Sequence, residues 1–80
     1  MRLDKFLKIS RLIKRRTLAK EACDNGKVTI NEKLGKASDK VEVGDILSIN
    51  FANREIKVKV ISSGLDLVNP KPEDLYERLN

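Results

Sequence analysis

Basic side chains crowd the first twenty residues, and their types are those that bind phosphate. The cluster consists of Arg2, Lys5, Lys8, Lys14, Arg15, Arg16 and Lys20. An arginine guanidinium is a planar fork that matches phosphate oxygens bidentately, whereas a lysine ammonium is a mobile point charge. We therefore expect Arg2, Arg15 and Arg16 to set the geometry of a phosphate contact and the lysines to add affinity. The alternative is that these charges only solvate two helices.

Asp4 interrupts this positive stretch. A carboxylate beside a phosphate is unfavourable unless it orients a cation or accepts a hydrogen bond from a base or a ribose hydroxyl. We predict that Asp4 orients Arg16 or Arg2. The alternative is an Asp4–Lys8 pair at i, i+4 on a helix, which contributes only about 0.2–0.5 kcal/mol.

The charge of the 80-residue chain is distributed unevenly, with a formal net charge of +5. Residues 1–36 hold eleven Lys and Arg against four acids, whereas residues 37–80 hold six against eight. Such a field attracts polyanions, so nucleic acid is the first partner to consider. Trp is absent and only three residues are aromatic. Structured RNA therefore suits the chain better than single strands, which need stacking platforms.

Enzymatic chemistry finds little support in the residues. Histidine, the commonest general base and a common metal ligand, is absent, so we expect no catalytic residue, no metal and no cofactor. Cys23 has no base to activate it and is expected to be a small buried hydrophobe. Gly26 and Gly44 stand outside the phosphate-loop motifs and are interpreted as turn residues. The sequence has no secretory signal, no transmembrane stretch and one cysteine, which together predict a cytoplasmic protein that does not bind membranes.

Two short helices are expected to position the basic cluster. Leu3, Phe6 and Leu7 stand at i, i+3 and i+4 and predict an amphipathic helix over residues 2–9. The inner face of a second helix is predicted to carry Leu18, Ala19, Ala22 and Cys23. Gly26 follows its end and supplies a left-handed residue. Packing of the two helices would bring the cluster onto one outer surface.

A change to period two predicts a small sheet after the helices. A strand over 27–31 leads into a turn over 31–35, and residues 41–43 form a brief extended segment. Residues 47–51 and 55–60 alternate as a hairpin with its loop at 52–54. The fold class is therefore α+β, with two packed N-terminal helices followed by a short, bent β-sheet.

The end of the chain differs in composition from the rest. Pro72 favours the first turn of a short terminal helix over 73–79, where Glu73 and Asp74 suit the helix N-terminus. We expect the tail, residues 62–80, to be loosely attached.

Four segments in order resemble the RNA-binding domain named after small-subunit ribosomal protein four. They are Arg2–Leu7, Arg16–Ala22, Gly26–Asn31 and Val43–Asp45, and the resemblance spans residues 1–61. It implies two packed helices leading into a small bent sheet. It also divides the chain into an RNA-binding domain, residues 1–61, and the C-terminal tail, residues 62–80.

Within this family the chain is similar to the stand-alone ribosome-associated heat-shock protein group, especially its short Gram-positive members. The resemblance implies that the chain binds rRNA of a large ribosomal subunit that still carries peptidyl-tRNA after stalling. It also implies that the chain holds the tRNA in the P site while the tailing factor RqcH adds alanines. Arg2, Asp4 and Arg16 would then face rRNA and tRNA, with Lys5, Arg15 and Lys20 as supports. Because the chain ends soon after the domain, we expect no attached enzyme, and a monomer off the ribosome.

Two other functions remain open at this point. One is a ribosomal or assembly protein bound permanently to a single rRNA site, which would use the same basic face. The other is a protein-interaction adaptor that uses strand edges and an acidic tail, with the basic cluster only solvated. Binding that is insensitive to salt would favour the adaptor.

Overall fold

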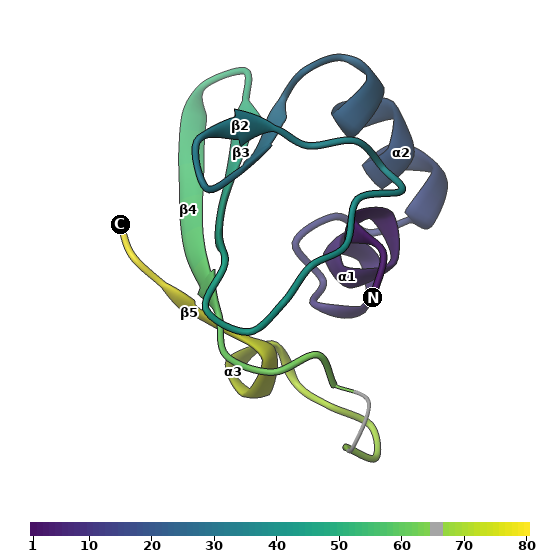
Figure 1. Ribbon diagram of the computed structural model, residues 1–80, viewed down its shortest axis with the longest axis vertical. Helices are drawn as coiled ribbons and strands as arrows, with labels where there is room; N and C mark the ends of the chain where they lie inside the picture. The colour runs from purple at the N-terminus through teal and green to yellow at the C-terminus, as the bar shows by residue number, and fades with distance from the viewer. Residues whose placement is uncertain (65–66) are drawn as a thin grey trace.

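The computed structural model describes residues 1–64 and 67–80, in which two N-terminal helices pack beside an antiparallel sheet and a short third helix precedes the last strand (Figure 1). The N-terminal helices are α1, Leu3–Ile9, and α2, Arg16–Asp24. The five strands lie in the order β2-β1-β3-β4-β5. Their bounds are Val28–Ile30 for β1, Lys33–Leu34 for β2, Ile46–Phe51 for β3, Arg54–Val60 for β4 and Tyr76–Arg78 for β5. The predicted α+β class and the two N-terminal helices are confirmed.

The apolar stripe of α1 fills the space between α2 and the sheet. Leu3, Phe6 and Leu7 are fully buried, as their spacing predicts, and they pack with buried residues of β1, β3 and β4. Burial of each such side chain stabilises the fold by about 1.5–3 kcal/mol. The core therefore fixes the direction of α1 and with it the direction of the basic residues on its outer side.

The inner face of α2 is narrower than predicted. Ala19 and Cys23 are buried and small, and α1 and α2 are in contact. Leu18 was expected on this face but is 46% exposed. The stripe runs through Ala19 and Cys23 at i, i+4, and Leu18 lies about 100° around the helix from it.

The predicted hairpin of β3 and β4 is confirmed, with one change at its turn. Phe51 pairs with Arg54, so the turn consists of Ala52 and Asn53 alone. Arg54 begins β4 and does not belong to the loop. Its guanidinium lies 5.9 Å from the centroid of the Phe51 ring, which is within the range of a cation–π contact.

The turn expected over residues 31–35 contains a strand that the sequence pattern did not predict. Asn31 and Glu32 have φ values of 50° and 72°, and positive φ at both positions is the signature of a tight hairpin turn. Lys33 and Leu34 then pair with β1 as β2. The Asn31 side chain also accepts the Ile46 amide at 2.9 Å, which joins this turn to the start of β3.

The brief extended segment predicted at residues 41–43 is not a strand. The backbone contacts of the loop between β2 and β3 are irregular: Arg2 and Lys40 form an isolated bridge, and Gly44 N donates to Val60 O at 2.8 Å. Val41 is buried but Val43 is 65% exposed. A turn at Gly44, with φ of 97°, separates this segment from β3.

The terminal segment is packed onto the sheet, so the expectation of a loosely attached tail is wrong. The helix α3, Pro72–Leu75, begins at the predicted proline but ends four residues early, and Tyr76–Arg78 then pairs antiparallel with β4 as β5. Leu75 is fully buried. An open edge of β4 leaves backbone groups without partners, and β5 satisfies them. Residues 65 and 66 of this tail lie outside the described residues.

None of the helices in the described part of the chain is long and apolar enough to cross a membrane.

Candidate nucleic-acid interface

A buried carboxylate joins the two helices at the centre of the basic cluster. Asp4 is only 3% exposed. Its Oδ1 lies 3.2 Å from Arg2 Nε, its Oδ2 lies 3.3 Å from Arg16 Nε, and Oδ1 accepts the Lys5 amide at 2.8 Å. The prediction that Asp4 orients Arg16 or Arg2 is confirmed for both arginines. The alternative pair with Lys8 is not the arrangement found among the described residues.

Each arginine reaches Asp4 from the start of a helix. Arg2 is the N-cap of α1 and Arg16 is the first residue of α2, whereas Asp4 lies in the first turn of α1, where the helix dipole favours a negative charge. The arginine side chains remain half exposed, at 52% for Arg2 and 48% for Arg16. Each guanidinium is therefore held by Asp4 on one side and presented to solvent on the other.

The charge of Asp4 is maintained by its partners. Burial alone would raise the pKa of this carboxyl because it disfavours the charged form. The side-chain hydrogen bond from Arg16, the Lys5 amide and the positive charges of Arg16 and Arg2 outweigh that effect, so the pKa of Asp4 lies below its usual value. The carboxylate is therefore ionised at neutral pH and holds both guanidinium groups.

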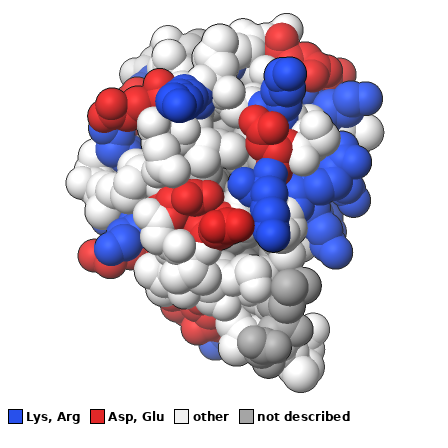
Figure 2. Space-filling model, in the orientation of Figure 1, with Lys and Arg blue, Asp and Glu red and all other residues white. Residues whose placement is uncertain are grey.

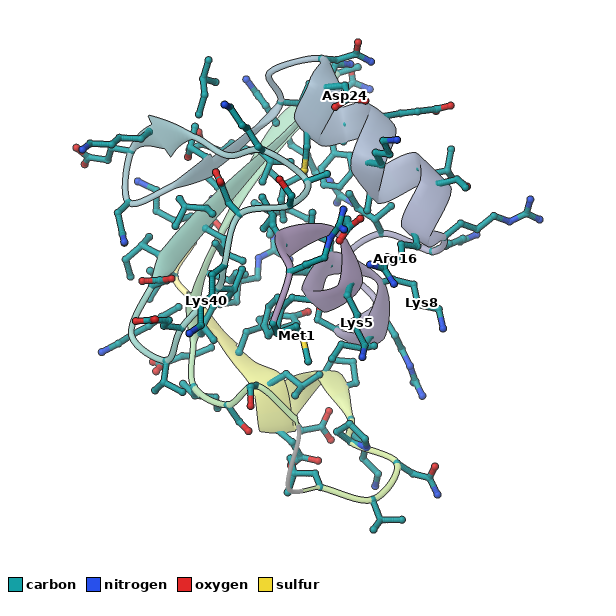
Figure 3. The ribbon with its side chains drawn as sticks, turned by 45° about the vertical axis from the view of Figure 1, so that its right-hand side comes forward. Met1, Lys5, Lys8, Arg16, Asp24 and Lys40 are labelled. Carbon is teal, nitrogen blue, oxygen red and sulfur yellow. The ribbon has the colours of Figure 1, made fainter. Side chains whose placement is uncertain are left out.

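The basic side chains gather on one side of the molecule, where α1 and α2 lie (Figure 2). Lys5 and Lys8 project from the outer side of α1, and Arg16 lies beside them at the start of α2 (Figure 3). The remaining predicted cations, Lys14, Arg15 and Lys20, are exposed as well. The expected common outer surface is present.

Most of these cations line one of two separate surface hollows. Lys5, Lys8 and Lys14 line a hollow of about 620 Å³ together with Arg11, which we call the basic groove. Its other lining residues among those that the structure describes are Met1, Ile9, Gly64, Asn69 and Pro70. Arg2 and Lys20 line a second hollow of about 550 Å³ together with Lys36. Arg15 and Arg16 line neither of them.

Sequence reasoning missed Arg11 and Lys36. Arg11 follows Lys8 by three residues and could have been included on that spacing. Lys36 lies in the long loop after β2, which returns to α1 through Leu3 N donating to Asp39 O at 2.7 Å and Asp4 N donating to Ala37 O at 3.1 Å. No local sequence pattern predicts that long-range contact.

Cys23 lies next to the second hollow but has no reactive character. It is 6% exposed, and burial together with the nearby carboxylates of Asp4, Asp24 and Asp39 raises its pKa to about 11. The thiolate is the nucleophilic form, so this thiol is inert at neutral pH.

Comparison with known proteins agrees with this fold and surface. The model of the S4 domain family matches residues 1–47. The "RQC P-site tRNA stabilizing factor" of Halalkalibacterium halodurans is 47% identical over 77 residues, which cover 96% of this chain and 88% of that protein. The protein of the same description from Bacillus subtilis is 57% identical over 60 residues, covering 75% and 70% of the two chains.

Two solved structures share the whole architecture. The trimeric structure of Vibrio cholerae heat shock protein 15 superposes with a TM-score of 0.85 at 30% identity, covering 99% of this chain and 81% of that one. The solution structure of the hypothetical protein HP1423 gives a TM-score of 0.79 at 31% identity, covering 100% and 98%.

A two-helix basic face on a small antiparallel sheet defines an S4-type module. The chain belongs to the S4 domain family and, within it, to the family of RQC P-site tRNA stabilizing factors, which are the RqcP proteins. The resemblance found from its sequence segments is thereby confirmed.

Proposed function

We propose that this chain is a non-enzymatic RNA-binding factor of ribosome-associated quality control, which binds the large ribosomal subunit and stabilises P-site tRNA. The observation that carries the proposal is the Arg2–Asp4–Arg16 cluster at the junction of α1 and α2. The description of the relatives as P-site tRNA stabilizing factors supports it.

The physical mechanism begins with charge and ends with geometry. The positive field of the helical face attracts RNA phosphates and speeds encounter. Asp4 then restricts the two guanidinium planes before binding, so less side-chain entropy is lost when they meet phosphates. The proposed RNA-binding residues are Arg2, Asp4, Lys5, Lys8, Lys14, Arg15, Arg16 and Lys20. The proposed RNA-binding domain comprises residues 1–61, with residues 62–80 as a tail.

A binding protein of this kind promotes a reaction without catalysing it. If the basic face touches rRNA and tRNA together, it binds their joint arrangement better than either RNA alone and shifts the population toward that arrangement. We propose that the arrangement is a large subunit with peptidyl-tRNA in the P site, on which the tailing factor RqcH adds alanines. The chemistry then belongs to the ribosome. The factor acts in the cytoplasm and is a monomer off the ribosome.

The second candidate is a constitutive rRNA-binding ribosomal or assembly protein, since the same basic face serves it equally well. Occupancy separates the two functions: a constitutive component is present on most subunits, whereas a quality-control factor is enriched on those with trapped peptidyl-tRNA. The protein-interaction adaptor is less favoured, because Asp4 holds two arginines in a shared geometry that simple solvation does not require.

The deciding experiment is co-sedimentation with ribosomal fractions from lysate in which translation is stalled. Wild type is compared with Arg2→Ala and Arg16→Ala, and with Lys59→Ala, which removes one exposed charge from β4. Each fraction is probed for peptidyl-tRNA.

Enrichment of wild type and Lys59→Ala on large subunits with peptidyl-tRNA, reduced in both arginine variants, supports the proposal. Even loading on all large subunits would indicate the constitutive protein instead. Absence from ribosomal fractions would exclude both functions and leave the adaptor.

A further inference from the structure

A small apolar hollow opens where α2 meets β3, at the end of the molecule that holds the turn between β3 and β4 (Figure 1). Its volume is about 310 Å³, and its apolar side chains include Ile13, Leu18 and Phe51. The hollow shares no described lining residue with the basic groove or with the hollow around Arg2 and Lys20. It is therefore a separate feature, which phosphate binding by the basic face does not use.

The side chains around the hollow are more exposed than the core requires. Leu18 is 46% exposed, on a helix whose buried stripe runs through Ala19 and Cys23. Ile13 and Phe51 are only half-buried. Large apolar side chains that border a concave surface typically line binding sites, because an occupant that excludes water from them gains affinity.

Phe51 supplies an aromatic ring with a cation beside it. The other phenylalanine, Phe6, is fully buried, whereas Phe51 lies at the end of β3 and lines the hollow. The Arg54 guanidinium is 5.9 Å from the centroid of the Phe51 ring. Unpaired nucleobases stack on aromatic rings, and arginine strengthens such stacks. One ring serves one base, which suits a structured RNA with an unpaired nucleotide.

The rim of the hollow offers hydrogen-bond donors and acceptors. Asn25 and Asn50 line it, and neither side-chain amide has a hydrogen-bond partner among the described residues. A carboxamide carries two donors and an acceptor, a combination that matches the edge of a base. Glu21 and Lys27 also line the hollow, so their charges offset each other. A near-neutral hollow of this kind suits a base better than a phosphate.

Lys27 is held in place between the two elements that form the hollow. Its amide donates to Ala22 O at 3.0 Å, and its carbonyl accepts the Asn50 amide at 2.8 Å. Lys27 also lines a smaller hollow of about 220 Å³ together with Asn50, Phe51 and Ala52. Its exposed side chain therefore starts from a fixed backbone at the edge of the site.

We infer that the hollow between α2 and β3 binds one unpaired nucleobase of the RNA that the basic face holds. The base lies against Leu18 and Phe51, and its edge faces the carboxamides of Asn25 and Asn50. Lys27 binds the adjoining phosphate. The inference rests on the proposed function and adds to it a site that reads a base.

A nucleobase is favoured over an apolar side chain of a protein partner for two reasons. An apolar side chain would leave the carboxamides of Asn25 and Asn50 without partners. In addition, α2 carries both surfaces, since Arg16 begins the helix and Asn25 is its C-cap. The nine residues of α2 span roughly 13 Å, which a few nucleotides of one strand cover.

The test uses the full chain and two fluorescently labelled RNA stem-loops that differ only in the loop. One loop consists of unpaired adenosines, and the other consists of abasic nucleotides, which keep every phosphate and remove every base. We expect wild type to bind the adenosine loop about tenfold more tightly, because one base stacks on Phe51. The slope of log K against log salt should be the same for both RNAs, since their phosphates are the same.

Two substitutions at one position separate stacking from folding. Phe51→Leu keeps an apolar side chain and should abolish the preference for the adenosine loop without changing the salt slope, whereas Phe51→Trp should keep the preference. Because the chain has no Trp, the fluorescence of Phe51→Trp reports stacking directly and should be quenched by the adenosine loop alone. Tyr76→Leu removes a half-buried ring from β5 and is the matched control, which should bind as wild type does.

Failure of this inference and failure of the proposed function give different results. If wild type binds both stem-loops equally tightly while Arg16→Ala weakens both, the proposed function stands and the base site is overturned. A preference for the adenosine loop that persists in Phe51→Leu would also overturn the assignment to this hollow. If wild type binds neither stem-loop, both proposals are wrong.

Discussion

Substitution of Asp4 by Asn distinguishes an oriented arginine cluster from a merely positive surface, because the two explanations predict opposite signs. The change raises the formal net charge by one from +5. If charge alone determined binding, RNA affinity would increase. If Asp4 acts by holding Arg2 and Arg16, the guanidinium groups become mobile and affinity decreases. We expect a decrease of about tenfold, equivalent to about 1.4 kcal/mol.

The effect of this substitution on stability follows from the contacts of Asp4. The carboxylate is 3% exposed and receives Arg2, Arg16 and the Lys5 amide. Removing one partner of a fully buried ion pair costs about 3–5 kcal/mol. Here both arginines are half exposed and regain water, so each pair resembles a surface ion pair, which contributes about 0–1 kcal/mol. Asn retains an acceptor for the Lys5 amide. We therefore expect a loss of about 1–2 kcal/mol, which lowers the Tm of a domain this small by about 4–16 °C.

Thermal unfolding, followed by circular dichroism, first gives the midpoint of each variant. RNA binding is then titrated by fluorescence anisotropy at a temperature well below the midpoint of Asp4→Asn. Lys59→Gln changes the charge in the opposite direction on an exposed strand position and is expected to weaken binding only slightly. Tighter RNA binding by folded Asp4→Asn, at every salt concentration, would refute the orientation argument.

Three further predictions concern acid stability, the C-terminal segment and the thiol. The folded pKa of Asp4 is below its ordinary value of 3.8, so the folded state binds fewer protons than the unfolded state in that window. The stability that Asp4 contributes is then complete above pH 3.8 and is lost as pH falls through the lower folded pKa. The free energies of unfolding of wild type and Asp4→Asn, measured with urea, should therefore converge in that acidic range. A difference that stays constant with pH would contradict the ion pairs. Leu75→Ala removes a fully buried side chain and should lower the free energy of unfolding by about 2–5 kcal/mol, as measured by chemical denaturation. A change below about 0.5 kcal/mol, typical of surface positions, would show that the tail is loosely attached. Cys23, with a pKa of about 11 and 6% exposure, should react with iodoacetamide at neutral pH only when the protein is unfolded in denaturant, and rapid labelling of the native protein in mass spectrometry would be inconsistent with its burial.

The elements that local pattern could predict are those whose side chains alternate between core and solvent over several residues. The α1 stripe of Leu3, Phe6 and Leu7 and the β3–β4 hairpin both have this property, and both are present. The orientation of arginines by Asp4 was also predictable, because a carboxylate amid cations on one surface has few other stable roles. These predictions needed only periodicity and charge.

The elements that were missed depend on pairing with distant strands. β2 has two residues and exposed side chains, so it carries no periodic signal, and it exists because Asn31 and Glu32 adopt positive φ. Tyr76–Arg78 follows a helical start and was assigned to that helix, but the open edge of β4 favours an extended conformation there. Tertiary pairing overrides local propensity in both places.

The C-terminal segment gains a functional meaning from this packing. The S4 domain model matches residues 1–47, which include α1 and α2 but neither β4 nor β5. A surface that matches several phosphates at once requires that its parts keep fixed relative positions, since each degree of freedom frozen on binding weakens affinity. α2 supports α1 through the Asp4 cluster, and the segment around Gly64 and Leu75 supports it near Ile9. Because contacts on both sides position α1, we expect that loosening the C-terminal segment weakens RNA binding, even though β5 itself lies outside the basic face.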